Sequence, residues 1–185
     1  MCLKRSFDYF KTLKDLACIN QQCFDALSVG KEFKNASVTF YGKRHELLQR
    51  LSDDFVAPIE RNDIYNLTNC IYSQFCEIVI LGDIIDGVAL LNEFTDSFKA
   101  LLKTQTDIFQ IFDKKSNYST IIKSSRNGQQ QALTLGRCIS SVATNRLKND
   151  SQLIYKYFVI SKVIDFCFCI NQTFCECERV AINNI

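Results

Sequence analysis

The chain has 185 residues, with 22 Lys and Arg against 20 Asp and Glu, a single His and a formal net charge of +2. This balance argues against nucleic-acid binding, which usually needs a clustered basic excess. Hydrophobic residues make up 47%, so the chain is not disordered, and one Pro with six Gly supplies few of the turns that a β-rich or α/β fold needs. We therefore expect an all-α protein. We also expect it not to be an enzyme, because a Ser–His or Cys–His nucleophile has only His45 available.

The chain contains ten cysteines, and their interpretation depends on the compartment. The first residues include basic side chains but no apolar run behind them, so we expect no secretory signal. In a cytoplasmic protein cysteines are reduced, and on helices they act mostly as small buried hydrophobic residues. The sequence therefore predicts free thiols in a cytoplasmic protein.

Apolar residues recur at three-, four- and seven-residue spacings, as on the buried face of an amphipathic helix. In the first half of the chain this pattern predicts three helices over about 4–30, 36–55 and 60–81. Pro58 ends the second helix, because a proline moves the residue before it out of the helical region. Glu60 and Asp63 then bring negative charge to the start of the third helix, where the helix dipole favours it.

Three more helices are predicted in the second half, over about 85–113, 118–147 and 152–182. Asn127 and Gly128 mark a candidate interruption of the fifth helix, and the run 149–151 is a candidate cap for the sixth. The six helices form two successive groups of three with short connections. We expect one antiparallel helical domain over residues 1–185, with helices 1–3 at about 4–81 and helices 4–6 at about 85–182.

Two apolar stretches, 78–91 and 158–170, resemble membrane segments at first sight. Each contains two charged residues, whereas a spanning helix needs about 20 apolar residues with few charges. We interpret both as buried helices.

The segment between the second and third helices has a distinctive pattern, in which a Leu and a Phe precede a proline and an acidic–Arg–x–Asp–Ile run follows it. The residues that carry it are Leu51, Phe55, Pro58, Arg61, Asp63, Ile64 and Leu67. This segment resembles the signature of the PhoU-related accessory proteins of Pit-type phosphate transporters. Glu60 is a conservative change from that signature, whereas Ala57 and Asn62 depart from it. The run 177–181 also resembles the closing segment of the family.

The resemblance implies a PhoU-like fold and a regulatory partner of a membrane phosphate transporter that acts by docking. Such a protein would be bacterial and cytoplasmic, peripheral to the inner membrane through its transporter. The candidate docking or structural residues are Phe55, Pro58, Glu60, Arg61 and Asp63. The residues alone favour a plainer interpretation of this junction, a capped turn with a surface ion pair, over a docking surface.

The resemblance also bears on metal binding. Family members carry acidic residues four apart on facing helices, which together supply oxygen ligands for a metal. At the corresponding positions this chain has Tyr41, Tyr72, Cys76, Arg137, Asn171 or Gln172, and Cys175. We therefore expect no bound metal and no cofactor.

Other side-chain groups offer weaker alternatives. Cysteines 167, 169, 175 and 177 are two C-x-C pairs, but residues two apart on a helix point in different directions, which argues against a zinc site. The resemblance implies that Cys76 and Cys175 approach each other in the core, where they would form an incomplete site for a soft metal.

Three polar groups have a plain interpretation beside a functional one. His45 with Glu46 is interpreted as a surface pair rather than a catalytic dyad. Asp83 with Asp86 is interpreted as charge at a helix junction rather than a cation site. The run 123–128 is a weak candidate for a basic, phosphate-binding turn. The alternatives to docking are thus a metal-binding helical protein that uses cysteines and carboxylates, and a structural homo-oligomer with the fourth and sixth helices at its interface.

Overall fold

The computed structural model describes residues 7–54, 57–84, 87–112, 114–146 and 153–185. Regular structure within these ranges is helical. The helices are α1 (Tyr9–Ser28), α2 (Lys34–Asp53), α3 (Arg61–Asp83), α4 (Gly87–Ile111), the short 3-10 helix η1 (Lys115–Asn117), α5 (Tyr118–Arg146) and α6 (Leu153–Asn183). The all-α class and the six predicted helices are confirmed.

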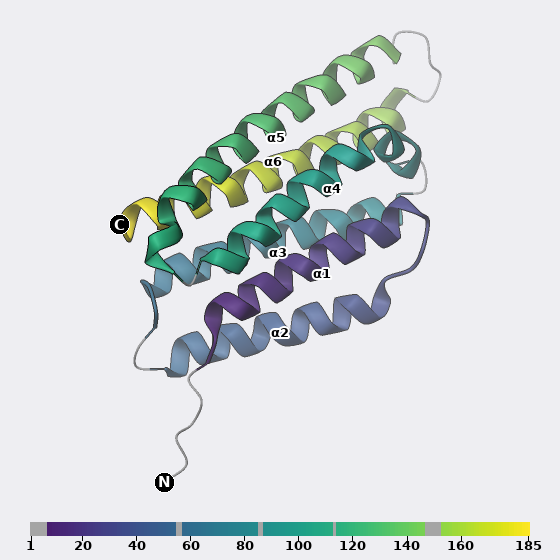
Figure 1. The fold of residues 1–185 in the computed structure, drawn as a ribbon. Coiled ribbons are helices and arrows are strands. Elements are labelled where there is room, and N and C mark those ends of the chain that lie inside the picture. The colour runs from purple at the N-terminus through teal and green to yellow at the C-terminus, as the bar shows by residue number, and fades with distance from the viewer. Residues whose placement is uncertain (1–6, 55–56, 85–86, 113, 147–152) are drawn as a thin grey trace.

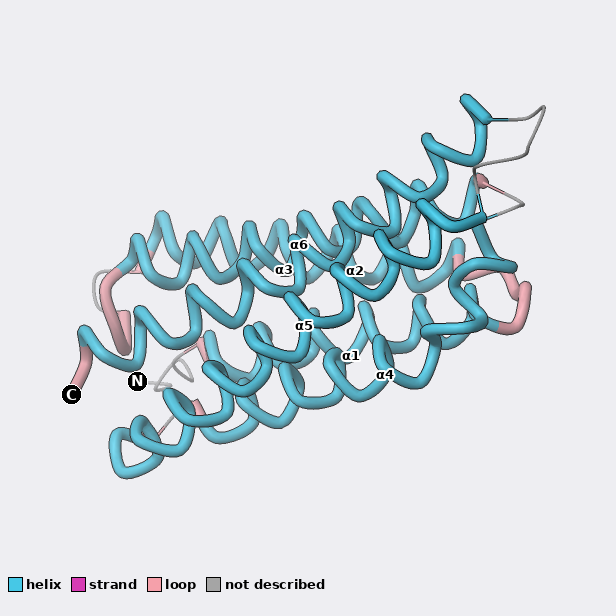
Figure 2. Tube along the Cα trace, turned by 90° about the horizontal axis from the view of Figure 1, so that it is seen from above, coloured by secondary structure: helices cyan, strands magenta, loops and turns pink. Residues whose placement is uncertain are grey.

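The helices form two three-helix groups, α1–α3 and α4–α6, that pack together along their length (Figure 1). Helices α1, α3, α4 and α6 contact one another at the centre. Helix α2 lies outside α1 and α3, and α5 lies on the opposite edge against α6 and α4. Viewed from above, α2, α3 and α6 form one layer, with α1 and α4 in a second (Figure 2). Most of the outer surface of α2 therefore faces solvent.

Local chemistry explains where several helices begin and end. The Asp8 carboxylate accepts a hydrogen bond of 2.9 Å from the Lys11 backbone N–H and so caps α1. Gly30, with a φ of 67°, follows the end of α1 in the left-handed conformation that favours glycine. Helix α3 begins after Pro58, as predicted, and ends one residue after Gly82.

The predicted interruption at Asn127–Gly128 is wrong, because α5 continues without a break from Tyr118 to Arg146. A Cβ atom at Gly128 would lie 2.5 Å from the ring of Phe174 on α6. The glycine therefore allows two helices to approach closely and does not break one. The basic turn predicted at 123–128 is wrong for the same reason, since these residues form the middle of a helix. The predicted cap at 149–151 lies outside the described residues.

The hydrophobic core contains buried residues from all six helices. Its centre is a triad of fully buried rings, Phe24 on α1, Phe98 on α4 and Phe166 on α6. Their ring centroids are 5.1 to 5.5 Å apart, the spacing of stacked and tilted aromatic pairs. This triad joins the two three-helix groups.

Candidate functional site

The proline junction between α2 and α3 is partly exposed and partly anchored in the core. Pro58, Glu60 and Arg61 are exposed, whereas Ile59 between them is buried. Glu60 is the N-cap of α3, but its side chain makes no capping hydrogen bond. Arg61 instead donates a hydrogen bond to the backbone carbonyl oxygen of Asp54 and so links the two sides of the junction. Phe55 lies outside the described residues.

Asp63 is the one buried residue among the described docking candidates of this junction, with 1% of its surface exposed. Its Oδ1 accepts a hydrogen bond of 2.7 Å from Nη2 of Arg179 near the end of α6. Arg179 also pairs with Glu176, and the hydrogen bonds to Glu176 and Asp63 raise the pKa of its guanidinium. The ion pair is therefore buried on the Asp63 side and partly exposed on the Arg179 side, and it joins the first turn of α3 to the end of α6.

A hollow of about 380 Å³ lies beside the junction, where the start of α1 meets the end of α2. The lining residues are Phe7, Asp8, Tyr9, Phe10, Asp54, Ala57 and Pro58. The Tyr9 hydroxyl donates a hydrogen bond of 2.7 Å to Oδ2 of Asp54. Burial and this hydrogen bond raise the pKa of Tyr9 to about 12, so the phenol stays protonated at neutral pH.

Three of the positions at which the resemblance implies lost acidic ligands come together on α2 and α3. The rings of Tyr41 and Tyr72 lie 6.3 Å apart, and a hydrogen bond with Cys76 raises the pKa of Tyr72. Beside them Phe40 and Phe75 stack at 4.1 Å. In this half of the molecule, aromatic rings pack together at the positions where the resemblance implies that acidic ligands have been lost.

Arg137 on α5 and Cys175 on α6 also stand where the resemblance implies lost acidic ligands, but these two residues do not come together. Gly136 packs against Cys167, and Gly128 against Phe174. This antiparallel register places Arg137 beside the turn of Cys167, about two turns from Cys175. Arg137 and Cys175 therefore do not belong to a common site.

The expected approach of Cys76 to Cys175 is not seen. Gln74 donates hydrogen bonds to the Cys169 carbonyl oxygen and the Thr173 hydroxyl, which fixes the register of α3 against α6. Cys76 lies half-buried near the turn of Cys169, whereas Cys175 is exposed.

The nine cysteines in the described part of the chain are free thiols, and several are held protonated. Burial raises the pKa of Cys167 to about 12 and that of Cys169 to about 11, and it also raises the pKa of Cys175. Such thiols are poor nucleophiles and poor metal ligands at neutral pH. Within the described part of the chain, no group of three or more His, Cys, Asp and Glu side chains is arranged to hold a metal ion.

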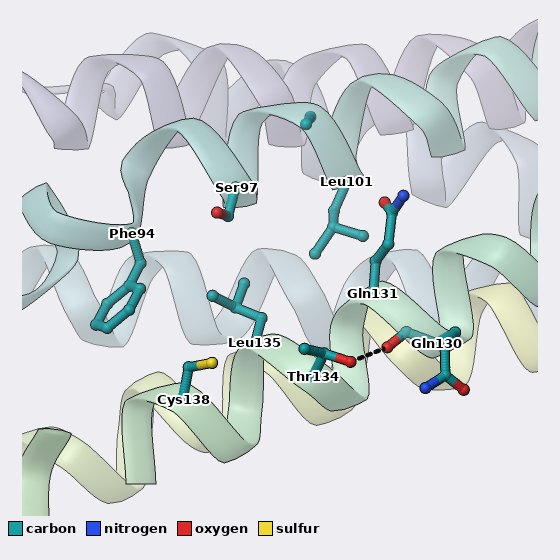
Figure 3. A pocket seen from close by; sticks show the side chains of 9 residues that line it. Phe94, Ser97, Leu101, Gln130, Gln131, Thr134, Leu135 and Cys138 are labelled. Carbon is teal, nitrogen blue, oxygen red and sulfur yellow. Dashed lines mark hydrogen bonds between the residues drawn. The ribbon is translucent and has the colours of Figure 1, made fainter. Parts of the chain in front are cut away.

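A groove of about 460 Å³ runs between α4 and α5 (Figure 3). Phe94, Leu101 and Leu135 give it apolar walls, and the Cys138 thiol lies beside Leu135 at its edge. The remaining lining residues are Ser97, Ala100, Gln130, Gln131 and Thr134. The Thr134 hydroxyl donates a hydrogen bond to the backbone oxygen of Gln130, within its own helix. The lining contains no charged side chain, which leaves it without an acid–base pair.

The remaining polar candidates are surface residues. His45 and Glu46 are both exposed on α2, as expected for a surface pair, and Asp83 is exposed at the end of α3. Asp86 lies outside the described residues.

Large apolar side chains are exposed along α6. Tyr157, Phe158, Phe168 and Ile182 have between 47% and 64% of their surface open to solvent. The stretch Tyr155–Asn183 is also the one helix in the described ranges that is long and apolar enough to cross a membrane. That criterion counts only length and composition, and core helices of soluble proteins also meet it. The interpretation of 158–170 as a buried helix holds for its inner side but is wrong for Phe158 and Phe168, which are exposed. Periodicity marks an apolar residue without showing whether another helix covers it.

Comparison with known proteins identifies no relative of this chain, since no family model and no curated protein matches it.

Proposed function

We propose that this protein is a non-enzymatic regulatory partner of a membrane phosphate transporter, and that it docks on the transporter through the outer face of α6. The resemblance at residues 51–67 supports the class of partner. The exposed apolar side chains of α6 support the docking face, and they are the observation on which the proposal depends.

Three of the exposed apolar residues of α6 are spaced so that they recur on one side of the helix. Phe168 follows Tyr157 by 11 residues, close to three helical turns, and Ile182 follows Phe168 by 14 residues, close to four. These three side chains therefore lie on nearly the same side of a strip about 37 Å long. Aromatic residues are enriched at protein interfaces, and exposed apolar strips of this kind commonly mark them.

Docking regulates transport only if the bound protein favours one state of the transporter over another. The helical bundle suits this role, because α6 is held along its inner side by α3, α4 and α5. A rigid helix presents its outer side chains without an ordering cost on binding.

Photo-crosslinking in cells tests this proposal. A photoreactive amino acid replaces Phe168, and the protein is co-expressed with a Pit-type phosphate permease. We expect a crosslink to the permease from position 168. The control replaces Gln110, which is exposed on α4, and we expect no crosslink from it. Equal labelling from both positions, or none from position 168, would contradict the proposal.

The same strip on α6 favours a homo-oligomer as a second candidate, because a two-fold interface requires one patch to pack on its own copy. Sedimentation of the purified protein separates the two. A dimer that dissociates on Phe168→Glu substitution supports self-association, whereas a monomer at all concentrations leaves the face free for another protein.

The metal content of the purified protein separates a docking protein from the alternative of a metal-binding protein that uses cysteines and carboxylates. The raised pKa values of the buried cysteines oppose the deprotonation that metal binding needs. Elemental mass spectrometry on protein purified without chelators should therefore give close to zero metal per chain. Iron or zinc in stoichiometric amount would instead support a metalloprotein.

A further inference from the structure

We propose that the face shared by α2 and α3 binds an oxyanion, a phosphate or a carboxylate, at the guanidinium of Arg44. This inference uses a different surface from the docking strip on α6 and does not depend on the proposed function.

Two contacts hold the Arg44 side chain in one orientation. Its guanidinium carbon lies 4.1 Å from the centroid of the Tyr72 ring, which sets the plane of the group. Its Nη2 donates a hydrogen bond of 3.2 Å to Oδ1 of Asn69, which sets the rotation within that plane. Tyr72 is in turn supported by Phe40, whose ring lies 6.5 Å away in a stacked arrangement. The guanidinium is therefore fixed before any ligand arrives.

The charge of Arg44 is not compensated within the described structure. The neighbouring cation Lys43 pairs with Asp15 at 2.7 Å, and Arg126 and Arg179 have carboxylate partners of their own. Within the described residues, no carboxylate lies within ion-pair distance of Arg44. The Nε atom of Arg44 is buried and has no hydrogen-bond partner. A cation that is oriented but unpaired is unusual, because a buried donor without a partner costs free energy.

An oxyanion is the ligand that fits this group. A guanidinium has five N–H donors in one plane, and its geometry matches two oxygens of a carboxylate or a phosphate. The hydrogen bond to Asn69 uses one N–H of Nη2, and Nε is buried, so the donors left for a ligand are the second N–H of Nη2 and those of Nη1. Arg44 as a whole is only half-buried, so part of its side chain is open to solvent.

The rim of this site supplies a further donor. Tyr41 lies beside Tyr72 and is 49% exposed, so its side chain is partly open to a molecule that binds at this face.

The experiment is a titration of the full-length protein followed by NMR of the arginine Nε–H signals, with the Arg44 signal assigned from its loss in Arg44→Lys. Sodium phosphate and sodium acetate are the two probes, and sodium chloride at matched ionic strength is the reference. We expect a saturable shift of the Arg44 signal with at least one probe and none with chloride. Tighter binding of phosphate identifies a free tetrahedral ion as the ligand, and equal or tighter binding of acetate identifies a carboxylate side chain of a partner.

The variants separate a built site from general charge attraction. Binding is followed in each variant through the signals of the surrounding backbone amides. Arg44→Lys keeps the positive charge but loses the paired N–H donors of the guanidinium. We therefore expect binding about tenfold weaker or more. Tyr72→Leu removes the stacking partner and should weaken binding as well, whereas Tyr72→Phe keeps the ring and should retain binding.

Lys43→Gln is the matched control, because it removes a neighbouring charge that already has a partner. Loss of binding in Lys43→Gln equal to that in Arg44→Lys, or no saturable shift with either probe, would overturn the proposal.

Discussion

At the scale of single residues, two glycines inside helices have opposite roles. Gly128 on α5 lies against the ring of Phe174, where a Cβ would approach to 2.5 Å. Gly42 on α2 has nothing within 4 Å of the same position. The first glycine is required by packing, and the second only lowers helix propensity.

Alanine substitutions should therefore change stability in opposite directions. Gly128→Ala forces the Phe174 ring or the α5 backbone to move, and we expect a loss of about 1–3 kcal/mol in the free energy of unfolding. Gly42→Ala adds a favourable helix former in open space, and we expect a gain of about 0.5–1 kcal/mol. Urea unfolding followed by circular dichroism measures both. A loss of stability in both variants would show that Gly42 also has a packing role.

Tyr9 gives a prediction about alkaline pH. Its pKa is raised to about 12 in the folded protein, above the value of about 10 for an unfolded tyrosine. The folded state therefore holds this proton more tightly, so the stabilising contribution is complete below pH 10 and is lost as the pH rises toward 12.

Tyr9→Phe isolates this contribution, because Tyr72 and Tyr118 titrate in both proteins and cancel in the comparison. Below pH 10 we expect the variant to be less stable by about 1 kcal/mol, since it lacks the hydrogen bond to Asp54. The difference should shrink between pH 10 and 12. Urea unfolding at several pH values across this range tests it, and a constant difference would mean that the phenol does not titrate above its ordinary pKa.

At the scale of helices, α1 and α2 have the same length of 20 residues but differ in burial. Ten residues of α1 are buried, whereas α2 buries only Phe40, Leu47 and Leu51. Helices gain most of their stability from packing, so a helix with few buried residues opens more readily than its neighbours.

We therefore expect the amides of α2 to exchange with deuterium faster than those of α1. Mass spectrometry of peptides from the two helices measures this at one pH and temperature. Because the helices are equally long, differences in fraying at their ends affect both alike. Equal protection of α1 and α2 would mean that α2 opens only when the whole protein unfolds.

The same scale shows what the sequence can and cannot predict. Periodic apolar residues and Pro58 were enough to predict six helices, because these signals act within one helix or one turn. The continuity of α5 through Gly128 depends on Phe174, 46 positions later, and no local signal reports it. Likewise, Asp63 reads as a capping residue in the sequence, but its partner Arg179 lies on α6. The sequence also cannot show that Arg44 lacks a carboxylate partner, because only the fold shows which carboxylates lie near it.

At the scale of the whole molecule, the question is whether the two three-helix groups unfold together. The ring triad of Phe24, Phe98 and Phe166 takes members from both groups, and the buried core includes all six helices. The sequence led us to expect one domain over 1–185. In that case a substitution in the triad must lower the stability of both groups by the same amount.

Phe98→Ala tests this, since it removes one fully buried ring and should cost about 3–5 kcal/mol. Phe168→Ala is the matched control, because the same change at a side chain that is 58% exposed should stay within about 0.5 kcal/mol. Native-state hydrogen exchange reports α1 and α6 separately, and we expect Phe98→Ala to lower the opening free energy of their most protected amides by the same amount. A loss of opening free energy confined to α6 would show that the molecule consists of two domains. The α3–α6 ion pair of Asp63 with Arg179 would then be a contact between domains.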